Sequence, residues 1–406
     1  MSRSPGRALV LLGIVVLALN LRPAAVSIGP VLDDVRAGLG MSGTEAGVLT
    51  ALPVVAFAIF GSVASRLAEA VGPHRLVAVA LVAVTAGQLA RTRVDTVWAF
   101  LALSLVALAG MATANVVLPS LVRRHFPDQV GTMTAVYSTA LAVGLTSASV
   151  LTVPIGGSGA DGWRTGLAAW ALLAAVALLP WLALLRRDRG RPRAEAADRV
   201  PLSAVARTRT GRALALMFGL QSIQAYSVFG WFAAVYRDAG FSSATAGLLL
   251  GVVTGVSIPL SFVVPQLAAR MSDVTPLVVA FGVLFVTGYV GLAVAPRTLA
   301  MLWAVVVGAA LCIFPLVLAL IGLRARTPEG TASLSSFAQS AGYLLSVAGP
   351  FGFGVLHDLT GGWTASLLAL AVVVVPLVAC GLVVARPTYV EDEVAALSRA
   401  RRPRGS

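Results

Sequence analysis

An arginine stands in the middle of the first apolar stretch of this 406-residue chain, where a charged side chain is least expected. Arg22 lies in "LALNLRPAAVSIGP" (17–30), about 14 residues or about 21 Å into a helix that should begin near residue 8. A charge at that depth costs about 2.5–3.5 kcal/mol on insertion scales, and an arginine cannot escape this cost by losing its proton. Such a residue needs a partner or a function.

Three roles for Arg22 follow from its neighbours. Pro23 removes a backbone hydrogen bond and disfavours helical geometry at the preceding residue, so the guanidinium could cap the carbonyls that a broken helix leaves free. It could instead extend along the helix towards the membrane surface. Or it could line a water-filled cavity and bind an anionic or strongly dipolar solute through its planar fork of donors. We favour the last role, which is compatible with the first.

Other polar side chains are expected at a similar depth, on helices that would surround such a cavity. Amides can donate to an anion or accept from a protonated ligand, and tyrosine offers a hydroxyl and a ring face. Each could equally bridge two helices by a hydrogen bond. Gln221 and Gln224, three residues apart beside Tyr226, are the best candidate cluster in the second half. The full set of candidate substrate-binding residues is Arg22, Asn20, Asn115, Tyr137, Gln221, Gln224, Tyr226, Gln339 and Tyr343.

The composition predicts the elements that hold these residues. The chain is 58% hydrophobic and 12% charged, and apolar runs long enough to cross about 30 Å of hydrocarbon recur throughout it. They predict an all-α membrane protein with twelve transmembrane helices, surrounded by the lipid bilayer. The expected helices are 8–34, 43–66, 75–92, 96–122, 130–155, 163–185, 212–236, 243–269, 274–295, 298–323, 331–356 and 363–385.

The distribution of arginines predicts the orientation. The chain has no lysine, and with both termini inside, 23 of its 30 arginines fall on the cytoplasmic side and 6 outside. This agrees with the positive-inside rule. The net charge of +13 is therefore attributed to topology, and no nucleic-acid partner is expected. We expect a multi-pass protein of the inner or plasma membrane with cytoplasmic termini.

The sequence also predicts two halves. Its longest polar segment, "RRDRGRPRAEAADRVPLSAVARTRTGR", divides the expected helices six and six, and after a shift of 200 residues Gly40 and Ser42 coincide with Gly240 and Ser242. Parallel repeats of this kind are typical of transporters that bind the substrate between the halves, near the midplane. The expected parts are an N-terminal six-helix bundle (1–185), a basic cytoplasmic loop (186–211), a pseudo-symmetric C-terminal six-helix bundle (212–386) and a cytoplasmic tail (387–406).

Sequence signals for catalysis are weak. We find no phosphate-binding loop, nucleophile elbow or paired catalytic carboxylates, and His74, His125 and His357 are too scattered in sequence to suggest a metal site. No enzymatic activity, cofactor or metal is expected. All 17 acidic residues fall in loops or at the ends of the expected helices, so no proton-carrying carboxylate is expected at the midplane.

The segment "GSVASRLAEAVGPHR" between the second and third expected helices resembles a cytoplasmic loop motif of the major facilitator superfamily. In that motif a Gly, an Asp and basic residues surround a tight turn. Gly61 and Arg66 match, but Ser65 stands where Asp is usual, and Glu69 is the candidate replacement for the acid. The resemblance implies a gating loop formed by Gly61, Arg66, Glu69 and Arg75.

Four more segments resemble the cyanate and 2-nitroimidazole transporter family within that superfamily. They are "LNLRPA" (19–24), "ANVVLPSLVRRHFPDQVG" (114–131), "GWRTGLAAWAL" (162–172) and "GLQSIQAYSVFGW" (219–231). The resemblance covers nearly the whole chain and implies the major facilitator fold and function as a monomer. It also implies secondary or facilitative transport of a small anionic or polar organic solute, cyanate- or nitroimidazole-like, by alternating access.

Two alternatives remain open at this point. A multidrug exporter of the same superfamily should have an aromatic-rich, acidic pocket, whereas this chain is 7% aromatic and carries an arginine inside the membrane. A membrane receptor that does not transport should carry a signalling domain, and twenty residues follow Arg386.

Overall fold

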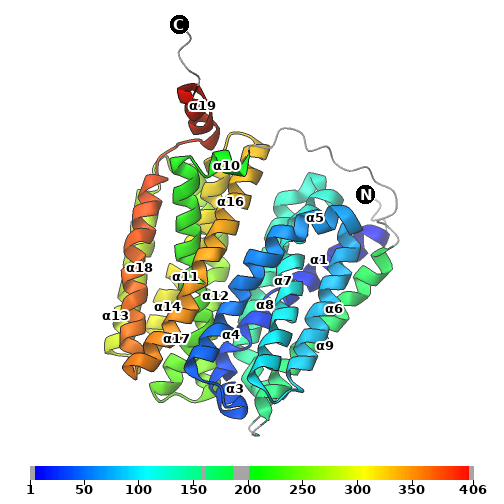
Figure 1. Ribbon diagram of the computed structural model, residues 1–406, viewed down its shortest axis with the longest axis vertical. Helices are drawn as coiled ribbons and strands as arrows, with labels where there is room; N and C mark the ends of the chain where they lie inside the picture. Colours follow the sequence, from blue (N-terminus) through cyan, green and yellow to red (C-terminus); the bar gives the residue numbers. More distant parts are fainter. Residues whose placement is uncertain (1–4, 158, 160, 186–200, 402–406) are drawn as a thin grey trace.

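The computed structural model describes residues 5–157, 159, 161–185 and 201–401, and every regular element in that part of the chain is a helix. The helices form two bundles that stand side by side, with both termini on the same side of the molecule (Figure 1). We call this side the termini side and the opposite one the far side.

The first span of the N-terminal bundle is interrupted. It consists of α1 (Pro5–Asn20), the one-turn α2 (Pro23–Val26), the 3₁₀ turn η1 (Gly29–Val31) and α3 (Leu32–Leu39). The rest of this bundle comprises α4 (Gly43–Ala56), the π-helical turn η2 (Phe57–Gly61), α5 (Ser62–Val71), α6 (Pro73–Arg91), α7 (Val97–His125), η3 (Pro127–Gln129), α8 (Val130–Gly156) and α9 (Gly162–Leu184).

The C-terminal bundle follows the same plan. Its elements are α11 (Arg209–Asp238), α12 (Ser243–Arg270), α13 (Thr275–Val294), α14 (Ala300–Ala310), α15 (Ile313–Leu323), α16 (Pro328–Ser346), α17 (Ala348–Thr360) and α18 (Trp363–Val383). In the expected central loop, residues 186–200 lie outside the described part, and the short α10 (Leu202–Val205) follows them. The expected tail contains a further helix, α19 (Val390–Arg401).

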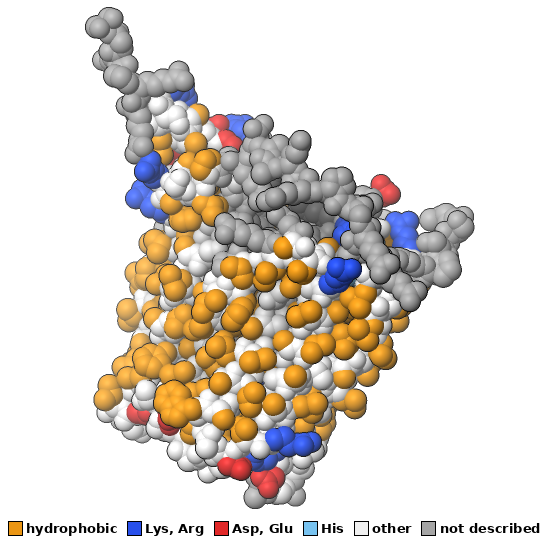
Figure 2. Space-filling view, turned by 45° about the vertical axis from the view of Figure 1, so that its right-hand side comes forward, with side chains coloured by type: hydrophobic (Ala, Val, Ile, Leu, Met, Phe, Trp, Pro, Cys, Tyr) orange, Lys and Arg blue, Asp and Glu red, His pale blue; other side chains and the backbone are white. Residues whose placement is uncertain are grey.

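Eleven helical segments in the described part are long and apolar enough to cross a membrane, against the twelve that the sequence predicts. The difference lies in the expected helix 331–356, which the structure divides at Val347 into α16 and α17. Figure 2 shows what these segments present to their surroundings: apolar side chains cover the middle of the visible face, and charged side chains lie towards its two ends. This surface fits a bilayer, as the composition predicts.

The 200-residue repeat of the sequence recurs in the structure. Ser42 caps α4 and Ser242 caps α12, each accepting a hydrogen bond from the N–H three residues later. Just before them, Gly40 and Gly240 both have positive φ, 64° and 95°, which glycine adopts without a Cβ clash. The same turn therefore precedes the second span of each bundle, at the positions that the repeat predicts.

The bundles are in close contact on the far side. α12 packs on α8 and α17 packs on α4 through glycines: a Cβ added to Gly247 would lie 2.8 Å from the Ser149 carbonyl oxygen, and one added to Gly47 would lie 3.2 Å from the Phe351 carbonyl oxygen. Gly47, Ser149 and Gly247 lie in the far-side halves of α4, α8 and α12. Towards the termini side, α8 and α12 line a cavity instead.

On the termini side, α19 is docked against the ends of two helices of the C-terminal bundle. Glu391 accepts hydrogen bonds from the N–H groups of Arg326 and Thr327, both at 3.0 Å. Glu393 accepts from the N–H group of Thr210 at 3.2 Å. These N–H groups lie at the starts of α16 and α11, where helices leave donors unpaired and favour negative charge. α19 therefore ties α11 and α16 together.

Candidate functional site

The first span breaks where the sequence places Arg22 and Pro23. α1 ends at Asn20, and α2 begins at Pro23 with Arg22 as its N-cap. The Arg22 carbonyl accepts hydrogen bonds from the N–H groups of Ala25 and Val26 at 3.1 and 3.0 Å, whereas its side chain makes no capping hydrogen bond. The guanidinium instead lines a cavity between the two bundles.

This cavity has a volume of about 570 Å³. Along α12 its wall runs from Val253 to Gln266, towards the termini-side end of that helix, and α8, α11, α15 and α16 supply the other walls. Most of the lining is apolar, including Phe229 and Phe314, and among the described residues that line it Arg22 is the only charged one. An unneutralised cation in apolar surroundings interacts strongly with an anion, because little water screens it.

Two tyrosines stand beside Arg22 in the cavity wall. The guanidinium interacts with the hydroxyl of Tyr226, which in turn interacts with Tyr343, and the two rings are 6.5 Å apart between centroids. Tyr343 also stacks on Phe57 of η2, with centroids 4.8 Å apart. Aromatic packing thus holds phenol groups next to the charge, where they can add donors for a bound anion.

The structure separates the two glutamines of the predicted cluster. Gln221 lines the cavity and donates to the Ser222 hydroxyl at 2.7 Å. Gln224 is buried inside the C-terminal bundle, where it donates to the Leu370 carbonyl at 3.1 Å and accepts from the Tyr289 hydroxyl at 2.7 Å. Residues three apart differ by about 60° around a helix axis, which is enough to turn Gln224 into the bundle.

The other predicted candidates lie outside the cavity wall. Asn20 is 2% exposed and donates to carbonyl groups of α1 and α9, at 2.8 and 3.2 Å, so it joins these two helices. Gln339 donates to the Ser335 hydroxyl at 2.7 Å. Asn115 on α7 and Tyr137 on α8 are half-buried. The residues that the structure brings together at the cavity are therefore Arg22, Gln221, Tyr226 and Tyr343.

Sequence reasoning missed the hydroxyl groups of the cavity. Thr254, Ser257 and Ser261 line it from α12, and Ser138 and Thr139 line it from α8. The α12 residues follow the spacing i, i+3, i+7 of one helix face, so the sequence does carry a signal for them. The Ser257 and Ser261 hydroxyls donate to carbonyls of their own helix at 2.5 and 2.7 Å, which leaves oxygen lone pairs on the cavity side of the helix for a polar solute.

The predicted gating loop forms the termini-side connection between the second and third spans. Gly61 ends η2, and Arg75 lies in the first turn of α6. The side chains of Arg66 and Glu69 lie outside the described part, so their pairing stays a prediction. In the same region His74 and His125, far apart in sequence, approach to 2.9 Å between their Nε2 atoms. The described residues contain no group of three or more His, Cys, Asp or Glu that could hold a metal.

Ion pairs join the bundles on the far side. Arg237, at the end of α11, lies 3.3 Å from a carboxylate oxygen of Asp33 and 3.2 Å from one of Asp34, both in α3. All three side chains are partly shielded from solvent. The pairs therefore connect the C-terminal bundle directly to the broken first span.

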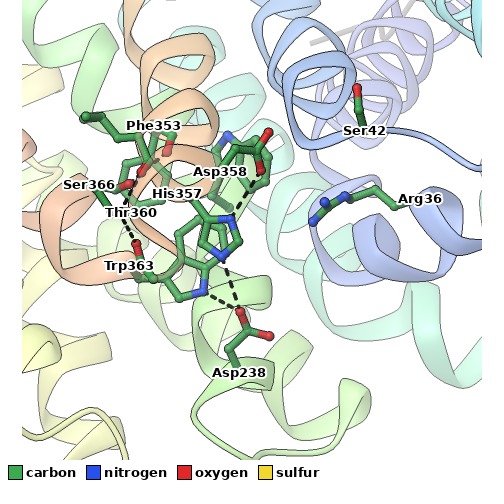
Figure 3. Close-up of polar contacts among 12 residues, drawn as sticks. Arg36, Ser42, Asp238, Phe353, His357, Asp358, Thr360, Trp363 and Ser366 are labelled. Atoms are coloured by element: carbon green, nitrogen blue, oxygen red, sulfur yellow. Dashed lines mark hydrogen bonds and ion pairs between the residues drawn. The ribbon is translucent and has the colours of Figure 1, made fainter.

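A second polar cluster surrounds His357 and includes Asp238, the residue that follows Arg237 at the end of α11 (Figure 3). The ring of His357 stacks on Trp363 at 3.9 Å, and its two nitrogens lie 3.8 Å from Asp238 and 3.6 Å from Asp358. Asp358 itself lies against Gly43, the first residue of α4 in the other bundle. Because a helix start carries partial positive charge, this carboxylate favours contact between the bundles. Both clusters therefore add contacts between the bundles on the far side.

Known proteins match this chain over most of its length. The family profile described as Major Facilitator Superfamily matches residues 10–350. The chain belongs to this superfamily. An uncharacterized transporter of Bacillus subtilis (strain 168), YycB, is 34% identical over 93% of this major facilitator chain and 94% of its own length. The 2-nitroimidazole transporter of Escherichia coli (strain K12) is 28% identical over 94% and 96%, and the cyanate transport protein CynX of the same organism is 30% identical over 87% and 91%.

Solved transporter structures share this major facilitator fold. A bacterial homologue of the human lysosomal transporter Spinster, inward-facing and occupied, has a TM-score of 0.76 at 16% identity and covers 97% of this chain and 99% of its own. The xylose transporter XylE of E. coli, partially occluded and inward open, has a TM-score of 0.72 at 14% identity, with 93% and 99% covered. Because the superfamily and the curated relatives named above are transporters, the chain is a transporter of small solutes and not an enzyme. Its resemblance to the cyanate and 2-nitroimidazole transporters is confirmed.

Proposed function

We propose that this protein carries a small anionic or strongly dipolar organic solute by alternating access, with Arg22 as the residue that binds the polar end of the solute. The observation that carries the proposal is the charge of the cavity wall: Arg22 is its only charged residue among those described, and it lies beside Tyr226. A guanidinium offers several donors in one plane, which suits a carboxylate, a nitro group or a linear anion.

The size and walls of the cavity favour a ring-bearing solute within that class. A volume of about 570 Å³ suits an organic ligand, whereas a three-atom anion such as cyanate would fill little of it. Phe229, Phe314 and Tyr226 present aromatic surface to the cavity. One of the similar proteins is named for 2-nitroimidazole, which combines a planar ring with a polar nitro group. A nitroimidazole-like solute therefore ranks before cyanate.

The arginine distribution supports an orientation for this transport. With the termini side in the cytoplasm, the arginine-rich loops lie inside, as the positive-inside rule requires. The cavity then faces the cytoplasm, and the far-side ion pairs of Arg237 close the outer face. The proposed setting is the cytoplasmic membrane, with a monomer as the functional unit.

The cavity wall also bears on the energy source. Proton-coupled transporters often use a titrating carboxylate within the membrane. The described wall of this cavity contains none. Exchange, facilitated diffusion or a proton carried by the solute itself fits this wall better than a proton-binding carboxylate at the midplane.

An exporter of bulky drugs is the second candidate, and the largely apolar wall of the cavity favours it. Such a protein should prefer neutral or cationic drugs. Arg22 would then have a structural role at the break of the first span and would not bind the ligand. The two functions therefore differ in the charge of the ligand and in its dependence on Arg22.

Ligand-induced thermal stabilisation of the purified protein separates the two candidates. The panel contains 2-nitroimidazole, cyanate, small carboxylates and cationic drugs, tested on wild type, Arg22→Ala and a control, Arg93→Ala, which removes an exposed far-side arginine. We expect 2-nitroimidazole or an anion to raise the melting temperature of wild type and control but not of Arg22→Ala. Stabilisation by cationic drugs alone, equal in all three proteins, would refute the proposal and support the exporter.

A further inference from the structure

A second arginine is buried behind the broken first span. The sequence places Arg91 among the arginines of the outer loops, yet as the last residue of α6 it is fully shielded from solvent. Its Nη1 donates to the carbonyl of Ala24 at 3.2 Å, and its Nε and Nη2 have no hydrogen-bond partner in the described part of the structure. A buried charge with one hydrogen bond is costly, so its position calls for a function.

The Ala24 carbonyl belongs to α2, a segment too short to be stable as an isolated helix. α2 is a single turn of four residues, bounded by Pro23 on one side and by the turn at Ser27 on the other. One helical turn is unfavourable in isolation, and its last carbonyls lack partners within the helix. Arg91 supplies the missing partner at Ala24. It reaches across from α6, 67 residues further along the chain.

The same turn sets the direction of the Arg22 side chain. Arg22 is the N-cap of α2, and its carbonyl accepts the first hydrogen bonds of that turn, from Ala25 and Val26. A shift or unwinding of the turn would change the backbone angles at Arg22 and move its guanidinium away from Tyr226. Contacts that fix α2 therefore fix the charged group in the cavity.

We propose that Arg91 is a positioning residue for the solute site: through the Ala24 carbonyl it holds α2 in the conformation that presents Arg22 to the cavity. This inference rests on the proposed function, because it assigns Arg91 a role only through Arg22. Arg91 lines neither the cavity nor the smaller void beside Arg22, so it does not touch the solute.

A double-mutant cycle tests this role. The four proteins are wild type, Arg22→Gln, Arg91→Gln and the double variant, and the dissociation constants of 2-nitroimidazole and cyanate are measured well below the melting temperature of each protein. For whichever of the two compounds the wild-type protein binds, we expect Arg91→Gln to raise the dissociation constant about tenfold. The same change should have no effect when Arg22 is already glutamine. Arg93→Gln, which removes an exposed arginine two residues away, should bind like wild type.

The outcomes separate this inference from the proposed function. Binding that is unchanged in Arg22→Gln would overturn the proposed function and this inference together. Binding that is weakened in Arg22→Gln but unchanged in Arg91→Gln would overturn only the role of Arg91. An equal loss of affinity in both backgrounds would also overturn that role alone, because Arg91 would then act independently of Arg22.

If Arg91→Gln does not fold, Arg91→Lys keeps the positive charge but lacks the planar guanidinium whose Nη1 donates to the Ala24 carbonyl. In proteoliposomes that variant should raise the KM for the probe and leave the maximal rate near that of wild type, because a misplaced Arg22 weakens binding while the bundles still move. A lowered rate at unchanged KM would contradict the positioning role.

Discussion

Replacing Arg237 by glutamine should shift the protein towards conformations that are open on the far side. The guanidinium pairs with Asp33 at 3.3 Å and with Asp34 at 3.2 Å, and its side chain is 24% exposed. Partly exposed pairs contribute about 0.2–1 kcal/mol each, so the two together stabilise the closed far side by about 1 kcal/mol. The fraction of molecules open on the far side should therefore increase about fivefold. Without Arg237, Asp33 of α3 also faces the like charge of Asp238 in α11, and this repulsion between the bundles acts in the same direction.

Distances between spin labels can measure this shift. Ala37 on α3 and Leu359 on α17 are exposed on the far side and belong to different bundles, so each can be replaced by cysteine and labelled. The native cysteines, Cys312 and Cys380, are replaced by alanine so that the labels attach only at these two positions. The long-distance population should grow about fivefold in Arg237→Gln.

A matched control makes this result decisive. Arg297→Gln removes one exposed positive charge from the same side of the same bundle. If Arg237→Gln and Arg297→Gln give the same distance distribution, the far-side ion pairs do not keep the transporter closed.

Two further predictions concern the cavity and α19. Tyr226→Phe removes the hydroxyl beside Arg22, so it should weaken the binding of 2-nitroimidazole or an anion by about 1 kcal/mol, or about fivefold, at a nearly unchanged melting temperature. An unchanged dissociation constant would show that the Tyr226 hydroxyl does not bind the solute. Burial acts to raise the pKa of Glu391, but hydrogen bonds from the start of α16 outweigh it and hold this pKa below its ordinary value of 4.5. The stabilisation from a lowered carboxyl pKa is present above the ordinary value and is lost as the pH falls through the lowered one. The fluorescence anisotropy of a dye on Ser398→Cys reports whether α19 is docked. It should stay constant from pH 7 to about pH 5 and fall in stronger acid, and adding Glu391→Gln should lower it already at pH 7. Equal anisotropy with and without Glu391→Gln would show that Glu391 does not dock α19.

The first span shows how far the sequence can lead. Arg22 followed by Pro23 inside an apolar run predicts a broken helix with a charge at depth, and the structure has both, with the charge in a cavity. The repeat could also be predicted, because Gly40 and Ser42 recur 200 residues later as Gly240 and Ser242, and in the structure both glycines have positive φ and both serines cap a helix. In each case the signal lies in a combination of residues at fixed spacing: an arginine before a proline, or a glycine two residues before a helix-capping serine.

Which way a buried polar residue points is much harder to predict. Gln221 and Gln224 have the same chemistry and nearly the same depth, yet one lines the cavity and the other bonds to Leu370 and Tyr289 within its bundle. In a two-bundle membrane protein both directions are buried, so hydropathy cannot distinguish them.

Arg91 shows a second limit of sequence reasoning. At the end of α6 it looks like a topology-setting charge of an outer loop. Its environment is decided by a carbonyl 67 residues away, that of Ala24, which is unpaired only because the first span breaks. Residue type and position along the chain contain no trace of that contact.

The docking of α19 has a consequence for how the protein is made. Glu393 bonds to Thr210, 183 residues earlier in the chain, and Glu391 bonds to Thr327, 64 residues earlier. During synthesis α11 and α16 leave the ribosome and enter the membrane before α19 is translated. The N–H groups at their starts therefore lack these carboxylate partners until late in translation. Final closure of the C-terminal bundle is then a late step of biogenesis. A stop codon before Val390 should yield a chain that inserts normally but lacks the carboxylates that bond to the starts of α11 and α16. Quality-control proteases should therefore degrade it faster than the full chain.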